Sequence, residues 1–468
     1  MRRFGYILLA LLTTYTLNAQ QKSEIQYEIF RQYVINHHPV VKQATLLSDQ
    51  AASYLQKARG AFDPKLYTDF EQKTFAGKRY YSIGDAGVKW RIGLGMTIKS
   101  NYLWSNGVYL NPENALPLAG QWNLGLELQA IQGLLIDERR TSLRQAQVMR
   151  ESSENEQLIV LNNLLQEAGY QYWQWVYTYR AYEAYEETLA KSISRFNWIR
   201  ERYLQGDLPA LDTLEAWIQV QTRRNEVLQA DQDLQSNQLK LAVFLWQDDK
   251  IDLELARVLV PVDPDPELPG DMLLEDDALL QEWVVSHPEM KAYDYKTQML
   301  DLDRKWTKEQ LKPSLAVSYQ LLGDGFQLAP PLPDSDLWLN NSKWGVRFGF
   351  PLFLRKERAN LALTDQKIRS VEWDSKLKEG ALISKINTYR QQALAAYEQW
   401  EQQESLIDNL ELLLEGETEK LRLGSSSVLV INLREQKVIE SRLKMLKWRT
   451  DLEKALVGWQ AATFNGGL

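Results

Sequence analysis

The sequence of 468 residues carries one plan twice, and this repeat constrains the fold more than any other feature. Four landmarks recur in the same order: His38–Pro39 with His287–Pro288, Pro64 with Pro313, Glu138–Arg139 with Glu357–Arg358, and Gly206 with Gly424. The offset is 249 residues for the first two landmarks and 219 or 218 for the last two. We therefore expect two equivalent halves, with about 30 extra residues between Pro64 and Glu138 in the first half.

The two halves meet in a proline-rich stretch. Residues 257–272 contain four prolines, which cannot continue a helix, so we expect an extended connector. This division predicts a first repeat over residues 20–256 and a second repeat over residues 273–468.

Short segments in each half alternate apolar side chains with polar residues or glycine. The alternation is regular over residues 122–129, 314–321 and 343–350, and rougher over residues 66–73. A period of two places the apolar side chains on one face of a sheet. Such a sheet fits a barrel wall in lipid, with its polar face toward an aqueous lumen, or the half-buried sheet of a soluble protein.

A fifth alternating run lies within the extra residues of the first half. It consists of Val88, Trp90, Ile92, Leu94, Met96 and Ile98. We expect this run to form an additional hairpin beside the barrel, and the sequence leaves open what the insertion around residues 80–118 does.

The helical segments are long. From Leu161 to Tyr203, apolar side chains recur at intervals of three and four, interrupted at Glu186 and Arg200, and residues 386–421 repeat the pattern. We expect the first of these helices to run from about Glu138 to Tyr203. At about 1.5 Å per residue, the first helix would be roughly 100 Å long. We expect aromatic residues of this seam, such as Tyr172, Trp175 and Tyr179, to pack against other helices rather than to bind a ligand.

Each long helix is expected to end near a glycine, either Gly206 or Gly424. A returning helix then runs to about Trp246 or Trp459. Residues 425–427 are all serine, and we expect them to cap the free N–H groups of the second returning helix. The predicted fold class is mainly α with β, built from an internal structural repeat.

The first 19 residues have the features of a secretory signal peptide. Arg2 and Arg3 precede an apolar core, and Ala19 precedes a polar stretch, so we expect cleavage after Ala19. The apolar run is shorter than the roughly 20 residues of a membrane-spanning helix. The absence of cysteine excludes disulfides, thiolate metal sites and a lipid anchor, and the net charge of −8 argues against a nucleic-acid partner.

Over nearly all of the mature chain, the sequence resembles the TolC-type outer-membrane efflux proteins. The doubled plan carries the resemblance, together with the strand-to-helix junctions 132–140 and 350–358 and the helix reversals 203–215 and 423–435. The resemblance implies a homotrimer in which long coiled helices form a periplasmic α-barrel. This tunnel would join a transmembrane β-barrel with four strands per protomer and twelve in the trimer.

The resemblance further implies a passive conduit of a tripartite efflux or type I secretion system, which exports small molecules or polypeptides from the periplasm to the exterior. It places the protein in the outer membrane, among lipid, with a periplasmic adaptor (membrane fusion) protein and an inner-membrane pump as partners. The adaptor would dock on the tips of the helical hairpins, at Gly206, Leu208, Gly424 and Ser425. The physical chemistry agrees with an oligomer, because lipid does not tolerate the two open edges of a four-stranded sheet.

In this family, polar and acidic side chains just past the tip glycines narrow the periplasmic mouth. Asp212 and Glu215 hold the matching positions after Gly206, on one helix face. They fit equally well as acids that the helix dipole favours in a first turn. The sequence departs from the pattern after Gly424, so the gate candidates there are Asn432, Arg434 and Glu435.

An enzyme is one alternative to a channel. The chain has three histidines, no cysteine, no glycine-rich phosphate loop and no zinc-protease motif, so we expect no enzyme, no cofactor and no metal. His38 and His287 precede prolines at equivalent positions, which indicates helix starts. The alternative is an exported coiled-coil periplasmic adaptor or scaffold, for which one helical hairpin between compact β modules would be expected. The exported substrate and the pump class stay open.

Overall fold

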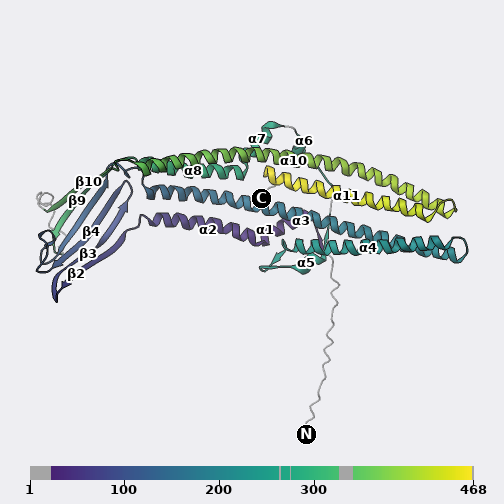
Figure 1. Cartoon of the computed structure of the whole chain (residues 1–468), viewed down its shortest axis with the longest axis horizontal. Coiled ribbons are helices and arrows are strands. Elements are labelled where there is room, and N and C mark those ends of the chain that lie inside the picture. Colours follow the sequence, from purple (N-terminus) through teal and green to yellow (C-terminus); the bar gives the residue numbers. More distant parts are fainter. Residues whose placement is uncertain (1–22, 263–264, 275, 326–340, 466–468) are drawn as a thin grey trace, which may run out of the picture. The chain divides into compact units, whose positions relative to one another are not determined.

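The computed structural model describes residues 23–262, 265–274, 276–325 and 341–465 (Figure 1). The expected signal peptide, residues 1–19, lies outside these residues. The chain divides into two compact units, and each unit takes segments from both repeats. The sheet unit comprises Gln43–Val160 and Asp277–Ser384, and the hairpin unit comprises Met1–Lys42, Leu161–Asp276 and Lys385–Leu468.

The sheet unit contains one antiparallel sheet of six strands, in the order β10-β9-β5-β4-β3-β2 (Figure 1). The strands are β2 (Lys65–Phe75), β3 (Lys78–Ile92), β4 (Met96–Asn106), β5 (Gln121–Gln129), β9 (Ser314–Asp324) and β10 (Ser342–Gly349). All four strands expected from the alternation are present. Because successive side chains point to opposite faces, one face of the sheet is apolar and the other is polar.

The internal repeat is confirmed element by element. Helices α2 (Pro39–Gly60) and α8 (Pro288–Glu309) each have 22 residues, and the strands that follow them, β2 and β9, each have 11. Both helices and both strands start 249 residues apart, as the sequence landmarks predict. A short helix, α7 (Asp277–Ser286), precedes α8.

The insertion in the first repeat forms a hairpin within the sheet, not beside it. Strands β3 and β4 lie between β2 and β5, so the sheet has six strands rather than four. The alternating run from Val88 to Ile98 is broken by a turn at residues 93–95, where Leu94 and Gly95 have positive φ. This turn reverses the chain, and the two arms of the run become neighbouring strands.

Two very long helices pass through both units. These are α3 (Glu138–Leu204, 67 residues) and α10 (Arg355–Arg422, 68 residues), close to the expected boundaries. Each reverses into a returning helix, α4 (Ala210–Ala242) or α11 (Val428–Thr463). Among the described residues, no helix is both long enough and apolar enough to cross a membrane.

His38 and His287 confirm the prediction of helix starts. The Nδ1 atom of His38 accepts a hydrogen bond from the Val40 N–H at 3.2 Å, and Nδ1 of His287 accepts one from the Glu289 N–H at 3.1 Å. Both imidazoles are buried. Each histidine therefore satisfies an N–H group in the first turn of the helix that follows it, α2 or α8.

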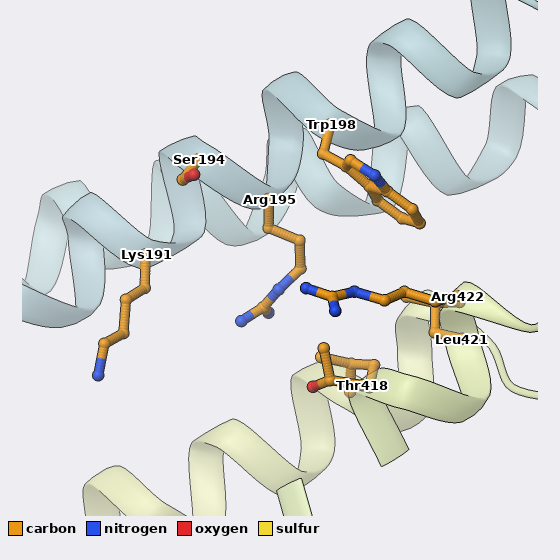
Figure 2. Close-up of a pocket in the computed structure, with 8 residues that line it drawn as sticks. Lys191, Ser194, Arg195, Trp198, Thr418, Leu421 and Arg422 are labelled. Atoms are coloured by element: carbon orange, nitrogen blue, oxygen red, sulfur yellow. The ribbon is translucent and has the colours of Figure 1, made fainter. Parts of the chain in front are cut away.

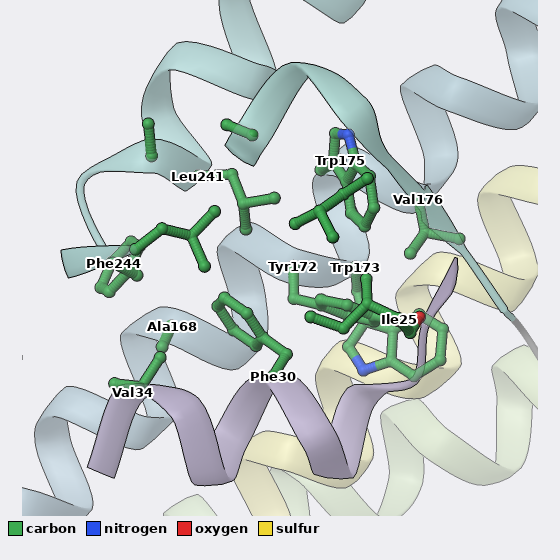
Figure 3. Close-up of a cluster of buried hydrophobic side chains, with 14 of the residues drawn as sticks. Ile25, Phe30, Val34, Ala168, Tyr172, Trp173, Trp175, Val176, Leu241 and Phe244 are labelled. Atoms are coloured by element: carbon green, nitrogen blue, oxygen red, sulfur yellow. Dashed lines mark hydrogen bonds between the residues drawn. The ribbon is translucent and has the colours of Figure 1, made fainter. Parts of the chain in front are cut away.

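The hairpin unit has an aromatic core on α3 (Figure 3). Tyr172 and Trp175 are fully buried, and Phe30 of α1 (Tyr27–His37) packs on Tyr172 with ring centroids 5.1 Å apart. The Tyr172 hydroxyl donates to the Ile25 carbonyl at 3.0 Å. The aromatic residues of α3 thus pack against neighbouring elements of the core, as expected from the sequence.

Short elements complete the hairpin unit. Strand β1 (Ser23–Ile25) pairs in parallel with β8 (Leu259–Pro261), which lies in the proline-rich stretch, and β6 (Trp246–Gln247) pairs with β7 (Lys250–Ile251). Two short helices, α5 (Leu253–Val258) and α6 (Gly270–Leu273), accompany them.

Candidate functional site at the helix reversals

The two reversals of the hairpin unit share one backbone geometry. Gly206 and Gly424 have φ of 85° and 76°, a conformation that side chains with a Cβ rarely adopt. In the first reversal, Gly206 N–H donates to the Tyr203 carbonyl at 3.0 Å and Asp207 N–H donates to the Arg202 carbonyl at 3.0 Å. These are the two hydrogen bonds of a glycine-centred helix C-terminal cap.

The second reversal repeats those hydrogen bonds 218 residues later. Gly424 N–H donates to the Leu421 carbonyl at 3.1 Å, and Ser425 N–H donates to the Lys420 carbonyl at 2.9 Å. The glycines were selected from the sequence for this role, and both occupy it. A Cβ at either glycine would meet no atom within 4 Å, so only the backbone conformation requires glycine there.

In the second reversal, the side chains of Ser425 and Ser426 hydrogen-bond to the preceding helix α10 rather than to the following helix α11. The Ser425 hydroxyl donates to the Lys420 carbonyl at 3.2 Å, and the Ser426 hydroxyl donates to Glu417 Oε1 at 2.7 Å. Ser427 occupies the cap position of α11 but makes no side-chain cap hydrogen bond. The prediction that these serines cap the returning helix is therefore wrong. The hydroxyls of Ser425 and Ser426 bond instead to the Lys420 carbonyl and the Glu417 carboxylate near the end of α10.

Asp212 and Glu215 lie in the first turns of α4 and are half-buried. Within the described residues, neither carboxylate has an ion pair or a side-chain hydrogen bond. Leu208 is half-buried, packed against the small cluster of Ile199, Ala216 and Val428. The first reversal therefore presents two acids that are free to meet a cation or a partner.

The equivalent region of α11 is different, because its acid is buried and paired. The Glu435 side chain is 5% exposed, and the Arg195 guanidinium of α3 donates a hydrogen bond to each of its carboxylate oxygens, at 2.5 Å and 3.1 Å. The same guanidinium donates to Asn432 Oδ1 at 3.3 Å. We name this trio the clasp, since it joins a helix of the first repeat to a helix of the second.

Arg434, the remaining candidate, is half-buried and close to the end of α10. Its charge contributes to lowering the pKa of the Glu417 carboxyl, after the larger effects of hydrogen bonds from Ser426 and Lys420. Arg434 therefore belongs to a polar group at the second reversal, not to the clasp.

A cavity of about 460 Å³ lies beside the clasp (Figure 2). Lys191, Arg195 and Trp198 of α3 line one side of it, and Arg422 of α10 lines the other. Lys191 is paired with Glu187 at 2.5 Å and Arg195 with Glu435, whereas Arg422 reaches Glu419 only at 3.4 Å on the surface. The lining is thus basic, with Trp198 as its aromatic side chain, and Arg422 is the most weakly paired of its three cations, which suits an acidic side chain of a partner.

Arg195 was not identified from the sequence, although a signal was present. Glu435 follows Ile431 by four residues and precedes Val438 by three, so it stands at a buried position of the apolar stripe of α11. A carboxylate at such a position requires a cationic partner. The sequence could not say which of the many basic residues supplies it.

Comparisons with known proteins identify the fold. No protein-family model matches the sequence, and no curated protein does. The structure resembles the outer-membrane channel OprN with a TM-score of 0.68 and 12% identity, over 94% of this chain and 90% of that one. The structure of CusC matches with a TM-score of 0.66 and 12% identity, over 95% of this chain and 93% of that one. The outer membrane protein VceC of Vibrio cholerae matches with a TM-score of 0.65 and 12% identity, over 93% of this chain and 95% of that one. The chain therefore has the TolC-type fold, which confirms the fold class expected from the sequence.

Proposed function

We propose that this chain is the protomer of a homotrimeric outer-membrane channel, a passive conduit through which substrates leave the periplasm. The proposal rests on the sheet, whose apolar face is open. Leu66, Trp344 and Phe348 of this face are 83%, 74% and 67% exposed in the single chain. A soluble protein rarely exposes so large an apolar patch, whereas lipid would cover it.

The edges of the sheet support an assembly of several copies. Strands β2 and β10 are at the two ends of the strand order, so one side of each has no hydrogen-bonded neighbour in the described chain. Open edges are not tolerated in lipid, because their backbone groups find no water. Pairing between copies would satisfy them. OprN, which this structure resembles, is an outer-membrane channel, and that likeness supports a channel role for this chain.

The proposal is tested by fractionation and electrophysiology. The full-length protein, expressed with its own leader, should enter the outer membrane and migrate as a heat-modifiable trimer. The purified trimer should conduct ions in planar bilayers. A soluble periplasmic monomer without conductance would contradict the proposal and favour the coiled-coil adaptor or scaffold.

We further propose that the helix reversals form the periplasmic gate and the docking tips. Three copies of Asp212 and Glu215 would give an acidic ring at the mouth. The clasp of Arg195 with Glu435 would hold α11 against α3 and keep the mouth narrow. Removing one partner of such a buried pair costs about 3–5 kcal/mol, enough to set the balance between two arrangements.

The tips at Gly206, Leu208, Gly424 and Ser425 are the proposed contact for a periplasmic adaptor, with an inner-membrane pump behind it. The basic cavity beside the clasp would receive acidic residues of that adaptor. A tripartite efflux or type I secretion system is the proposed setting, with small molecules or polypeptides as cargo, after removal of residues 1–19. No catalytic step is proposed. Purification of the native complex under mild crosslinking should identify the adaptor and pump.

A further inference from the structure

The hairpin of β3 and β4 is joined to the rest of the sheet along its whole length. Strand β4 pairs with β5 from Met96↔Leu128 to Leu103↔Gln121 without a register shift. Strand β3 pairs with β2 from Lys65↔Lys89 to Phe75↔Lys78, with one irregularity near the tip. A hairpin that lay against the sheet as an appendage would lack one of these two ladders.

The apolar face of the sheet continues across this hairpin. In register with the apolar residues of β5 lie Met96, Ile98 and Tyr102 of β4, and beyond them Val88, Trp90 and Ile92 of β3. Val88 and Trp90 are 39% and 44% exposed, which matches 45% and 44% for Leu124 and Leu126. The hairpin therefore presents its apolar side chains on this face to the same extent as β5 does.

The polar face continues in the same way. The Asp85 carboxylate of β3 accepts hydrogen bonds from Asn101 at 2.6 Å, from Lys99 at 3.2 Å and from Tyr67 at 3.2 Å. Tyr67 belongs to β2, and the other two donors belong to β4. This network connects three strands on the face opposite to Val88 and Trp90, so the polar face extends across the hairpin. Exceptions in the hairpin include Ile83 and Leu103 on the polar face and Ser100 on the apolar face.

A tryptophan ring covers a glycine on the neighbouring strand both in the hairpin and in the strands expected from the repeat. The Trp104 ring of β4 covers its register partner Gly84, where a Cβ would lie 2.0 Å from the ring. The Trp122 ring of β5 covers Gly323 of β9, where a Cβ would lie 1.8 Å from Nε1. Both pairs lie on the apolar face. Tyr102, opposite Trp122, continues the aromatic row into the hairpin, as expected of an interfacial girdle.

The hairpin strands are also long enough to cross a bilayer. Strand β3 has 15 residues and β4 has 11, whereas a tilted transmembrane strand needs about 9–11. Inserting two strands preserves the alternation of direction, because β2 and β5 stay antiparallel in orientation with or without them.

We infer that the hairpin of β3 and β4 belongs to the membrane-spanning wall, and that three copies close as an eighteen-stranded barrel. In this assembly β2 of one copy pairs with β10 of the next, and lipid covers Val88 and Trp90. Since barrel diameter grows roughly linearly with strand number, the lumen is about 1.5 times as wide as that of a twelve-stranded barrel. The inference rests on the proposed trimeric channel and fixes the width of its outer opening.

The chain has no cysteine, so single-cysteine variants test this directly. The hairpin variants are Val88→Cys on the apolar face and Lys89→Cys on the polar face. The matched controls on β5 are Leu126→Cys and Glu127→Cys. Each variant carries an environment-sensitive fluorophore, in trimers reconstituted into vesicles with brominated acyl chains. Val88→Cys should be quenched as strongly as Leu126→Cys, and Lys89→Cys should react with a water-soluble maleimide as Glu127→Cys does.

Two results would overturn the inference, and they are distinguishable. If Leu126→Cys is quenched and Val88→Cys is not, the hairpin lies outside the wall while the channel proposal stands. If neither is quenched, the sheet is not in lipid at all, and both proposals fail.

Discussion

The two helix reversals have the same backbone and opposite side-chain chemistry. Gly206 and Gly424 make the same turn with the same hydrogen bonds, 218 residues apart. Beyond the first glycine, Asp212 and Glu215 are unpaired within the described residues. Beyond the second, Glu435 is 5% exposed and held by Arg195. Within the described chain, the first repeat therefore has two carboxylates without an ion pair past its glycine, whereas the acid past the second glycine is neutralised by an arginine.

This difference separates what the backbone of a helix reversal requires from what it leaves open. A reversal between paired helices needs a residue with positive φ at one position, so the glycine is retained in both copies. The side chains that follow carry no such constraint. They form a charged surface in the first repeat and a structural ion pair in the second. The following predictions test this division of roles.

The largest effect is expected from Arg195→Ala. It leaves the Glu435 carboxylate buried without a counter-charge, which should cost about 3 kcal/mol of helix packing at the second reversal. If the clasp keeps the mouth narrow, single-channel conductance should rise several-fold. Cells should also become sensitive to bulky antibiotics that the outer membrane excludes.

The matched control is Arg202→Ala. Arg202 pairs with Asp207 at 2.7 Å in the first reversal, but the two side chains are 41% and 50% exposed. Such a pair contributes about 0–1 kcal/mol, so conductance should stay unchanged. The exchange Arg195→Glu with Glu435→Arg should restore a narrow mouth. Equal conductance in wild type and Arg195→Ala would remove the clasp from the gate.

The second prediction compares the two glycines. Gly206→Val and Gly424→Val each force a β-branched residue into positive φ, at about 1–3 kcal/mol. Because the space around both glycines is open, strain is the only expected effect, and the two variants should be equally affected. We expect lower export with unchanged trimer levels, measured by drug sensitivity and by immunoblots of the outer membrane. Normal export in the double variant would exclude these turns as docking tips.

The sequence predicted the elements that depend on period and spacing. The starts of α2 and α8, the ends of the long helices and both glycine turns follow from local patterns, and all were found. The six-stranded sheet was missed, because an alternating run does not reveal a turn at Leu94, a residue that seldom has positive φ. The clasp was missed because pairing between residues 240 positions apart leaves no local signal beyond an acid in an apolar stripe.

The third prediction concerns the free acids of the first reversal. If Asp212 and Glu215 line the mouth, three copies concentrate negative charge, which favours cations and binds trivalent ions that block the pore. The double variant Asp212→Asn/Glu215→Gln should shift the reversal potential toward zero in a salt gradient and weaken block several-fold. Asp207→Asn serves as the comparison, and block should persist in it, because Asp207 is an acid of the same reversal that is already paired with Arg202 and lies outside the clasp. Unaltered block in the first variant would assign these acids to the helix dipole alone.

The smallest effect is expected at the two histidine caps, where the repeats differ again. Burial among Phe244 and Trp246 lowers the pKa of the His38 imidazole, which the Val243 carbonyl and the Glu167 carboxylate only partly offset. His287, by contrast, has the Glu289 carboxylate 4.0 Å from its Nδ1. That carboxylate is also paired with Lys378 at 2.7 Å, so an acid and a lysine lie beside the cap at His287.

Since the folded state disfavours the charged form of His38, stability should be full above the ordinary histidine pKa of about 6.5 and fall as pH drops below it. Protonation also turns Nδ1 from an acceptor into a donor and removes the cap on Val40 N–H, worth about 1 kcal/mol. His38→Asn keeps an acceptor without a titrating group, so it should flatten the profile of unfolding temperature between pH 7.5 and pH 5. His287→Asn serves as the comparison at the equivalent cap. If both variants keep the wild-type slope, the acid sensitivity arises from carboxylates elsewhere, and the two caps are equivalent.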